Sequence, residues 1–217
     1  MDQDKLNKQS NYWESNFSKK PLMFGLIPSA ASLSALKKFE EDNIKEIIEL
    51  GAGLGRDTVF FAKNKIKVEA LDYSSTAIKI IEEKAKDNNL SKFISTKLFD
   101  IRNKLPYKDN SINGIFSHML YCMALTNSDI KKLNDEILRI LKPGGINIYT
   151  VRNTSDGDYK KGIHRGEDMY ENDGFIINFF SEIKVNVLLE GFKNLSITNF
   201  EEGNFPRKLF LIQNKKL

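Results

Sequence analysis

Short apolar runs alternate with amphipathic stretches along most of the chain. The runs that predict strands are Lys45–Leu50, Lys67–Leu71, Ile94–Leu98, Gly114–Ser117 and Ile146–Val151. Between the second and third runs, apolar residues recur at helical spacing after a capping residue, Ser74 or Ser75. A second helix, capped by Asn127 or Ser128, follows the fourth run. Strands that alternate with helices build repeated βαβ units, so the pattern predicts an α/β fold with a doubly wound, mostly parallel sheet and helices on both faces.

Three parts of the chain depart from this alternation. Residues 1–43 predict an N-terminal helical segment, and 153–174 form a polar, glycine-rich stretch without periodicity, interpreted as a long loop or excursion. A helix is predicted from Ser181 to Gly191, followed by two closing strands, Asn194–Phe200 and Arg207–Gln213, with an antiparallel strand at the C-terminal end. The length of 217 residues leads us to expect a single domain over 1–217.

Composition limits the classes of function. The net charge is +4, from 33 basic and 29 acidic residues scattered along the chain, which favours a solvated surface over nucleic-acid binding. The N-terminus lacks the apolar core of a signal peptide, and the apolar stretch Gly114–Leu125 is too short to cross a bilayer. Cys122 is the only cysteine, which excludes an intrachain disulfide and a multi-cysteine metal site. We therefore expect a cytoplasmic protein, monomeric or homodimeric, with no metal and no membrane partner.

A glycine-rich loop follows the first predicted strand, in the string "IELGAGLG". Bare backbone at Gly51, Gly53 and Gly55 lets a ligand approach the carboxyl edge of a parallel sheet, where open α/β folds bind their ligands. Asp72 ends the second strand, where a carboxylate can accept hydrogen bonds from both hydroxyls of a ribose. Arg56 replaces the third glycine of the dinucleotide fingerprint, and the P-loop string does not occur. The loop with Asp72 therefore favours a ligand with an adenosine ribose over a dinucleotide or a P-loop phosphate, although a glycine turn can also serve only tight packing.

Five motifs in the same order resemble those of the class I S-adenosylmethionine-dependent methyltransferases. They are "IELGAGLG", "VEALDYS", "LFDI", "GIFSHML" and "ILRILKPGG", and they span roughly 44–151. The resemblance implies a Rossmann-like sheet, S-adenosylmethionine as cofactor and S-adenosylhomocysteine as product. The [ND]-P-P-[YF] string and the Pro-Cys nucleophile of two nucleic-acid-modifying branches are both missing. The general pattern is similar to the small-molecule branch that includes the tellurite-resistance and thiopurine types, which implies a small-molecule acceptor.

The resemblance also assigns cofactor contacts by position. It places Glu49 at the glycine loop and the cofactor's ammonium end, although a carboxylate bonded only to neighbouring amides is the alternative. Asp72 receives the ribose, and Asp100 and Ile101 receive the adenine edge. Arg56 needs an anionic partner near a helix start, either the cofactor's carboxylate or Asp57. The whole predicted cofactor set is Glu49, Gly51, Ala52, Gly53, Gly55, Arg56, Asp72, Tyr73, Asp100, Ile101 and Ser117.

The acceptor side carries weaker signals. His118 follows the fourth strand and is our candidate catalytic base or substrate contact, with a structural role at a helix start as the alternative. The N-terminal aromatics either fold over the cleft or pack a helix onto the sheet, and 153–174 is either a lid or a mobile surface loop. Candidate acceptor contacts are Tyr12, Trp13, Tyr121, Arg152, His164 and Tyr170, together with Arg165 in the loop.

Three other functions remain open at this point. A methyltransferase of the same fold that acts on protein or RNA would need a basic face around the cleft. A non-catalytic module would keep the S-adenosylmethionine site without turnover. A nicotinamide-dependent oxidoreductase is disfavoured by Arg56 in the glycine loop.

Overall fold

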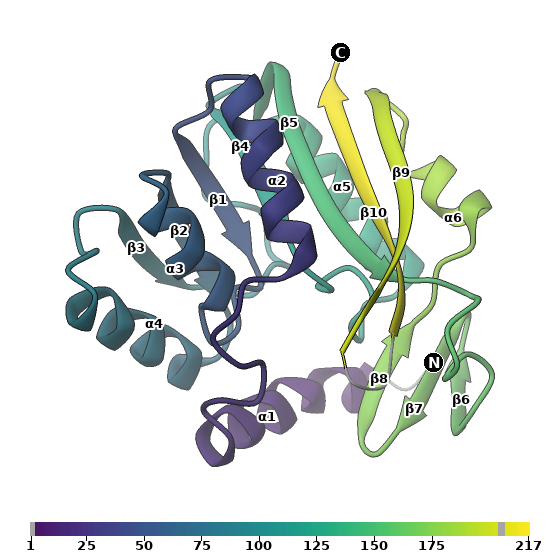
Figure 1. Ribbon diagram of the computed structural model, residues 1–217. Coiled ribbons are helices and arrows are strands. Elements are labelled where there is room, and N and C mark those ends of the chain that lie inside the picture. Colours follow the sequence, from purple (N-terminus) through teal and green to yellow (C-terminus); the bar gives the residue numbers. More distant parts are fainter. Residues whose placement is uncertain (1–2, 204–206) are drawn as a thin grey trace.

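A seven-stranded mixed sheet forms the centre of the computed structural model, which describes residues 3–203 and 207–217 (Figure 1). The strand order is β3-β2-β1-β4-β5-β10-β9. The first five are parallel: β1 (Glu46–Leu50), β2 (Lys67–Asp72), β3 (Ile94–Leu98), β4 (Ile112–Ser117) and β5 (Leu141–Arg152). The closing hairpin, β9 (Phe192–Glu202) and β10 (Arg207–Lys216), runs antiparallel and pairs with β5 through β10. The predicted Rossmann-like, mostly parallel sheet is confirmed.

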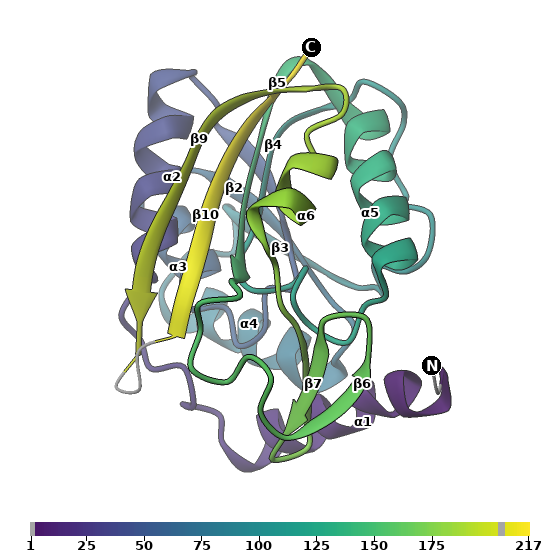
Figure 2. The same ribbon diagram turned by 90° about the vertical axis from the view of Figure 1, so that its right-hand side faces the viewer.

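Helices cover both faces of this sheet, as Figure 2 shows for α2 and α3 on one side and α5 and α6 on the other. The alternation of side chains along each strand supplies both cores: Ile47 packs with the helices of one face, and Ile48 belongs to the core of the other. The helices are α1 (Gln3–Lys19), α2 (Ala30–Glu41), α3 (Arg56–Lys63), α4 (Ser75–Asp87), α5 (Asn127–Ile140) and α6 (Glu182–Val187). None of the helices within the described residues is long and apolar enough to cross a membrane.

Two of the predicted helix starts are correct and one is off by a residue. Ser74 caps α4 by accepting a hydrogen bond from Ala77 N, and Ser181 caps α6. The cap of α5 is Thr126 rather than Asn127 or Ser128. Thr126 and Asp129 form a reciprocal capping box, which satisfies the N–H groups of both residues and fixes the helix start one position earlier.

The stretch 153–174 is not the irregular loop that its composition predicts. It leads into a second, three-stranded antiparallel sheet of β6 (Ile163–Gly166), β7 (Met169–Asn172) and β8 (Phe175–Asn178). Strands of four residues are too short to display an alternating pattern, which is why the sequence hides them. The turn from β7 to β8 has two left-handed residues, Asp173 at φ 49° and Gly174 at φ 83°.

Helix α1 lies along the edge of the large sheet at which the parallel strands end, between α4 and the small sheet (Figure 1). Glu14 of α1 accepts hydrogen bonds from Ser74 Oγ, Ser75 Oγ and Thr76 Oγ1 at 2.5, 2.9 and 2.6 Å. At the other side of α1, Gln9 Nε2 donates to Gly174 O at 2.9 Å. We call α1 together with the β6–β8 sheet the cap, because the two segments cover this edge together.

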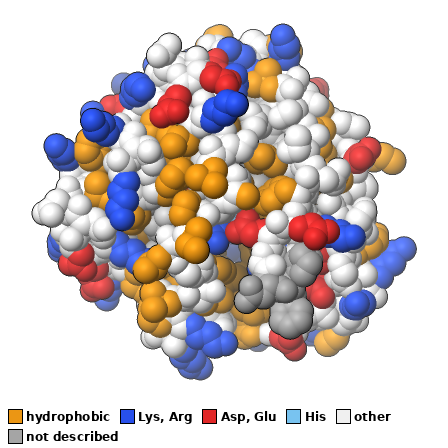
Figure 3. Space-filling view, viewed as in Figure 1, with side chains coloured by type: hydrophobic (Ala, Val, Ile, Leu, Met, Phe, Trp, Pro, Cys, Tyr) orange, Lys and Arg blue, Asp and Glu red, His pale blue; other side chains and the backbone are white. Residues whose placement is uncertain are grey.

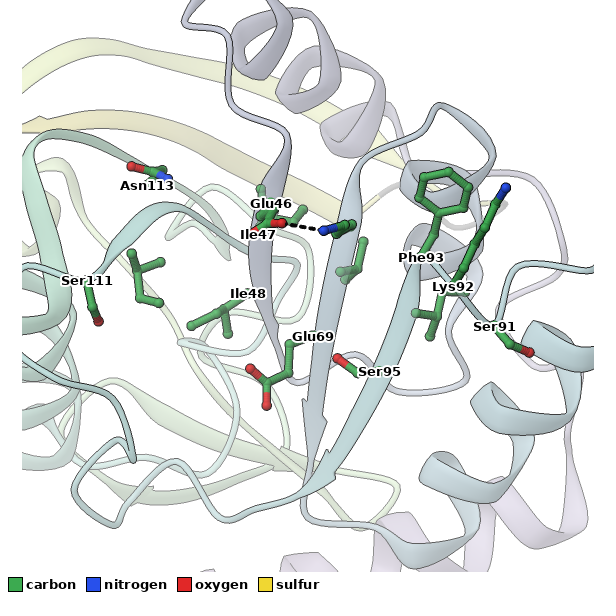
Figure 4. Close-up of a pocket in the computed structure, with 14 residues that line it drawn as sticks. Glu46, Ile47, Ile48, Glu69, Ser91, Lys92, Phe93, Ser95, Ser111 and Asn113 are labelled. Carbon is green, nitrogen blue, oxygen red and sulfur yellow. Dashed lines mark hydrogen bonds and ion pairs between the residues drawn. The ribbon is translucent and has the colours of Figure 1, made fainter.

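The opposite end of the strands carries a bare groove of about 310 Å³. Figure 4 shows Ile48 of β1, Glu69 of β2 and Ser95 of β3 along its floor, and the register places these three residues side by side. An ion pair of 2.7 Å between Glu46 and Lys67 lies beside it. The groove exists because the chain passes from β3 to β4 without a helix. It lies towards the amino ends of the strands, away from the glycine loop.

Candidate active site

The glycine loop makes a tight turn between β1 and α3. Gly51, Gly53 and Gly55 have φ of 67°, 54° and 75°, which favours glycine at each position. A Cβ atom at Gly51 would lie 2.8 Å from Leu120 and one at Gly55 would lie 2.6 Å from Ile81, so packing also excludes a side chain there. The nearest atom at Gly53 is 3.7 Å away. Gly53 is therefore the loop position with open space beside its backbone.

Asp72 is held by the backbone of the segments it joins. Its Oδ2 accepts a hydrogen bond from Gly53 N at 2.8 Å, and its Oδ1 accepts one from Ser74 N at 2.9 Å. Ala52 N donates to Leu71 O at 3.0 Å and ties the same loop to the end of β2. Burial raises the pKa of Asp72 to about 6 because the charged form loses water. The two amides fix the carboxylate while each oxygen keeps a lone pair for a ligand.

Glu49 is buried at the end of β1, with an exposed fraction of 3%. Its hydrogen-bond partner among the described residues is Thr58, whose Oγ1 donates to Oε2 at 2.5 Å. The bond goes to α3 rather than to the glycine loop or to neighbouring amides, the two alternatives expected from the sequence. Burial, reinforced by the nearby charge of Asp57, raises the pKa of Glu49 well above its usual range.

A small cavity of about 40 Å³ brings together the predicted adenine contacts. Tyr73, Asp100 and Ile101 line it from the ends of β2 and β3, and Trp13 of α1 covers it. The carboxylate of Asp100 is occupied by Arg102, whose Nη2 lies 2.6 Å from Oδ2 and whose Nε donates to both oxygens at 3.0 Å. Arg102 also donates to Asn7 of α1 at 2.7 Å, so α1 is tied to this cavity.

Arg56 pairs with a residue that the sequence did not predict. Its Nη2 lies 2.6 Å from Glu202 Oε1 at the end of β9, whereas its Nε is 3.8 Å from Asp57. Asp57 instead accepts hydrogen bonds from Ser29 N and Ser29 Oγ at 2.8 and 2.9 Å. Glu202 was missed because the predicted strand ended at Phe200. Glu201 and Glu202, which precede Gly203, were the acidic residues from which a partner for Arg56 could have been predicted.

Glu202 also reaches His118, so three elements meet at one point of the edge. His118 Nε2 lies 3.5 Å from Glu202 Oε2, and its Nδ1 lies 2.9 Å from Thr150 Oγ1 of β5. Burial lowers the pKa of His118, because the charged imidazolium is less well solvated there. The neighbouring Ser117 Oγ is buried without a hydrogen-bond partner among the described residues. A polar network therefore lies at the ends of β4, β5 and β9.

The N-terminal aromatics pack the cap together. Tyr12 stacks edge to face on Phe175 at 4.8 Å, and its hydroxyl donates to Asp173 O. Trp13 lies 4.8 Å from the Phe175 ring and also packs against Phe17 and Phe24. Trp13 lines the small cavity as well, so it combines the two roles that the sequence left as alternatives.

Two predicted acceptor contacts are buried and engaged elsewhere. Tyr121 is fully buried, and its ring stacks on Tyr149 at 4.4 Å. Arg152 is 6% exposed and forms ion pairs with Asp156 and, at 2.6 Å, with Asp158. These contacts anchor the start of the excursion to the large sheet. In this structure neither side chain is free to meet an acceptor.

The remaining acceptor candidates interact within the small sheet. His164 Nε2 lies 2.9 Å from Glu167 O, and its ring packs at 4.9 Å from Tyr170. Tyr170 also packs on Tyr159 at 5.7 Å, and Arg165 pairs with Glu171 at 2.5 Å. The structure thus gathers His164, Tyr170 and Arg165 within the cap, and Tyr170 also contacts Tyr159 and Phe179 just outside it.

Comparisons with known proteins place this geometry in a class. Residues 47–145 match the family described as methyltransferase domain. Phosphoethanolamine N-methyltransferase 1 of Triticum aestivum is 33% identical over 147 residues, which is 63% of this chain and 28% of that protein. Phosphoethanolamine N-methyltransferase 1 of Zea mays is 31% identical over 159 residues, covering 67% and 30% of the two chains. The chain thus spans less than a third of the length of these relatives.

Solved structures share the fold at lower identity. An S-adenosylmethionine-dependent methyltransferase from Methanosarcina mazei has a TM-score of 0.68 and 21% identity, covering 79% of this chain and 92% of that one. The 1,6-didemethyltoxoflavin-N1-methyltransferase of Burkholderia thailandensis, solved with S-adenosylhomocysteine, has a TM-score of 0.72 and 14% identity, covering 97% and 89%. TehB from Haemophilus influenzae has a TM-score of 0.67 and 18% identity, covering 94% and 67%.

The domain match and the shared fold confirm the class predicted from the five motifs. Residues 47–145 form a methyltransferase domain, and the chain has the fold of class I S-adenosylmethionine-dependent methyltransferases.

Proposed function

We propose that this protein transfers a methyl group from S-adenosylmethionine to a small-molecule acceptor. The observation that carries the proposal is the juxtaposition of the glycine loop, Asp72 and the Tyr73–Asp100–Ile101 cavity at one sheet edge under the cap. The relatives named as phosphoethanolamine N-methyltransferases support a small-molecule acceptor.

The residues present fit the cofactor. Glu49 and Asp72 are buried carboxylates whose hydrogen bonds come from neutral groups, a threonine hydroxyl and two backbone amides. Buried carboxylates gain from a positive charge or from additional donors. S-adenosylmethionine brings both, with an ammonium group, a sulfonium and two ribose hydroxyls. We assign Asp72 to the ribose, Glu49 to the cationic end, and Tyr73 with Ile101 to the adenine.

S-adenosylmethionine supplies an electrophilic methyl group on its sulfonium. The chain's own task is then to hold an acceptor in line with that group and to exclude water. The cap is suited to this task because it lies over the edge where both ligands would meet. We propose that the excursion acts in this way as a lid, docked through Gln9 and Tyr12 of α1.

Thermal denaturation with added ligands tests the cofactor, and a metabolite screen tests the reaction. S-adenosylmethionine and S-adenosylhomocysteine should raise the melting temperature through mass-action linkage, and NAD should not. Labelled S-adenosylmethionine incubated with a metabolite extract should then yield a labelled small molecule. Stabilisation by NAD alone would refute the cofactor assignment. Label found only in protein or RNA would refute the small-molecule acceptor.

A further inference from the structure

The protonation pattern of His118 follows from its neighbour Thr150. Thr150 Oγ1 accepts a hydrogen bond from Met119 N at 2.9 Å and lies 2.9 Å from His118 Nδ1. Thr150 is fully buried, so its hydroxyl hydrogen needs an acceptor, and Nδ1 is the one in reach among the described residues. If the hydroxyl donates to Nδ1, the proton of the neutral imidazole is on Nε2.

Nε2 of His118 therefore faces Glu202 as a donor. The charged groups around the ring are Glu202 of β9, Asp57 and Arg56 of α3, and Arg207 of β10. Burial lowers the pKa of His118, so the ring is neutral at pH 7. A neutral imidazole with Nδ1 bonded to a hydroxyl and Nε2–H turned to a carboxylate offers no free lone pair. This arrangement argues against His118 as a general base, which is one of the roles that the sequence leaves open for it.

Glu202 has one carboxylate oxygen that is poorly satisfied. Its Oε1 is bonded to Arg56 at 2.6 Å, while within residues 3–203 and 207–217 its Oε2 makes only the long 3.5 Å contact with His118 Nε2 and no hydrogen bond. The side chain is 20% exposed, and a buried acceptor without a partner is costly. Figure 3, in the view of Figure 1, shows a hollow with acidic and hydrophobic side chains along part of its rim. A ligand that offers N–H groups would remove the cost.

We propose that Glu202 binds the acceptor through Oε2, and that the acceptor is an amine. Arg56 and His118 are positioning residues that hold the two carboxylate oxygens, one from each side. The inference rests on the proposed methyl transfer and names its substrate class. An ammonium matches the carboxylate in charge, whereas a phenol or a carboxylic acid would meet like charge after ionisation. Passing one N–H proton to Oε2 leaves the electron pair on nitrogen, as a nucleophile requires.

The first test compares two glutamates of the same strand. Glu202→Gln removes the charge at the site, and Glu201→Gln removes a charge from an exposed neighbour. Transfer from labelled S-adenosylmethionine is measured to a panel of primary and secondary amines, including ethanolamine and phosphoethanolamine, and to catechol. We expect kcat/KM for the best amine to fall at least tenfold in Glu202→Gln, and to stay within twofold of wild type in Glu201→Gln. Calorimetry should show S-adenosylmethionine affinity within twofold of wild type in both variants.

The second test measures directly which nitrogen of the His118 imidazole carries the proton, and it needs no acceptor. The chain has two histidines, so a His164→Gln variant assigns the ¹⁵N resonances of His118 by difference. We expect a neutral ring protonated on Nε2 at pH 7, with a Thr150→Val variant losing that preference. A ring protonated on Nδ1 would overturn the positioning role of His118, whatever the activity.

The outcomes separate this inference from the methyltransferase proposal. Unchanged amine kinetics in Glu202→Gln, or transfer to catechol and to none of the amines, would overturn the amine site. Transfer to no compound of the panel, with S-adenosylmethionine still bound, would also overturn it and leave the cofactor assignment standing. Failure of wild-type protein to bind S-adenosylmethionine would refute the proposed function itself.

Discussion

The carboxyl edge of the sheet has two halves that are built differently. In the cofactor half, at the ends of β1, β2 and β3, the backbone amides of Gly53 and Ser74 fix the carboxylate of Asp72. In the proposed acceptor half, at the ends of β4, β5 and β9, side chains fix one another, with Glu202 between Arg56 and His118. Backbone donors change little when side chains are substituted. The comparison suggests that the cofactor half is rigid by construction and that the acceptor half can be altered residue by residue.

The largest effect is expected in the cofactor half. Asp72→Ala removes a charged acceptor, and hydrogen bonds to charged groups contribute about 1.5–3 kcal/mol. The dissociation constant of S-adenosylmethionine should therefore rise by about one to two orders of magnitude in calorimetry. Asp87→Ala, at the end of α4, is a control that should leave affinity unchanged. An unaltered dissociation constant in folded Asp72→Ala protein would contradict the ribose assignment.

Acidification should also weaken S-adenosylmethionine binding, but less than Asp72→Ala does. The pKa of Asp72 is about 6, so the ligand-binding charge is present above pH 6 and lost below it. S-adenosylmethionine affinity should fall by about tenfold for each pH unit below 6, measured by calorimetry from pH 8 to pH 5. The pKa of Asp72 is raised from 3.8 in the folded protein, so folding favours its protonated form. As the pH rises from about 4 to 6, the free energy of unfolding of the ligand-free protein should therefore fall. A flat affinity profile would show that Asp72 carries no ligand-binding charge.

Loss of one hydrogen bond in the cap should raise the local amide exchange rate several-fold. Tyr12→Phe keeps the ring contact with Phe175 and removes the hydrogen bond to Asp173 O. One hydrogen bond contributes about 0.5–1.5 kcal/mol, so amide exchange at the β7–β8 turn should accelerate by about two- to tenfold. Tyr159→Phe removes a hydroxyl bonded to Asp168 within the excursion and serves as the matched control. Equal exchange rates in Tyr12→Phe and wild type would argue against docking of the lid through α1.

A substitution in the groove at the amino ends of the strands should have the smallest effect on binding and methyl transfer. Ser95→Ala changes its floor without touching either half of the carboxyl edge. Both S-adenosylmethionine affinity and methyl transfer should stay within twofold of wild type. A larger loss of either would mean that the two ends of the sheet are coupled.

The sequence predicted that the glycine loop and Asp72 lie together at one sheet edge, because these motifs are local. A strand, its glycine loop and the next strand end lie within 27 residues, from Glu46 to Asp72, so the spacing alone places Gly53 beside Asp72. The acceptor half depends on pairing across long distances. Arg56 and Glu202 are 146 positions apart and meet only because β9 and β10 have a particular register. No local pattern specifies that register.

Other differences have similarly physical origins. Arg152 is buried by Asp156, four positions later, and that short spacing was a signal for an ion pair rather than for a ligand contact. Tyr121 lies in an apolar run, and its ring stacks in the core instead of facing the edge. The strands of the small sheet are four residues long and pack against Leu6 of α1, a contact that periodicity does not report.

Helix α1 touches both the proposed cofactor half and the small sheet proposed as a lid. Glu14 bonds to the start of α4, Asn7 to Arg102, and Gln9 to the β7–β8 turn. A ligand that stabilises the docked helix thereby lowers the cost of ordering the lid for the other ligand. By thermodynamic reciprocity each ligand must then raise the affinity of its partner by the same factor. One helix would thus make the two proposed substrates heterotropic activators of each other's binding.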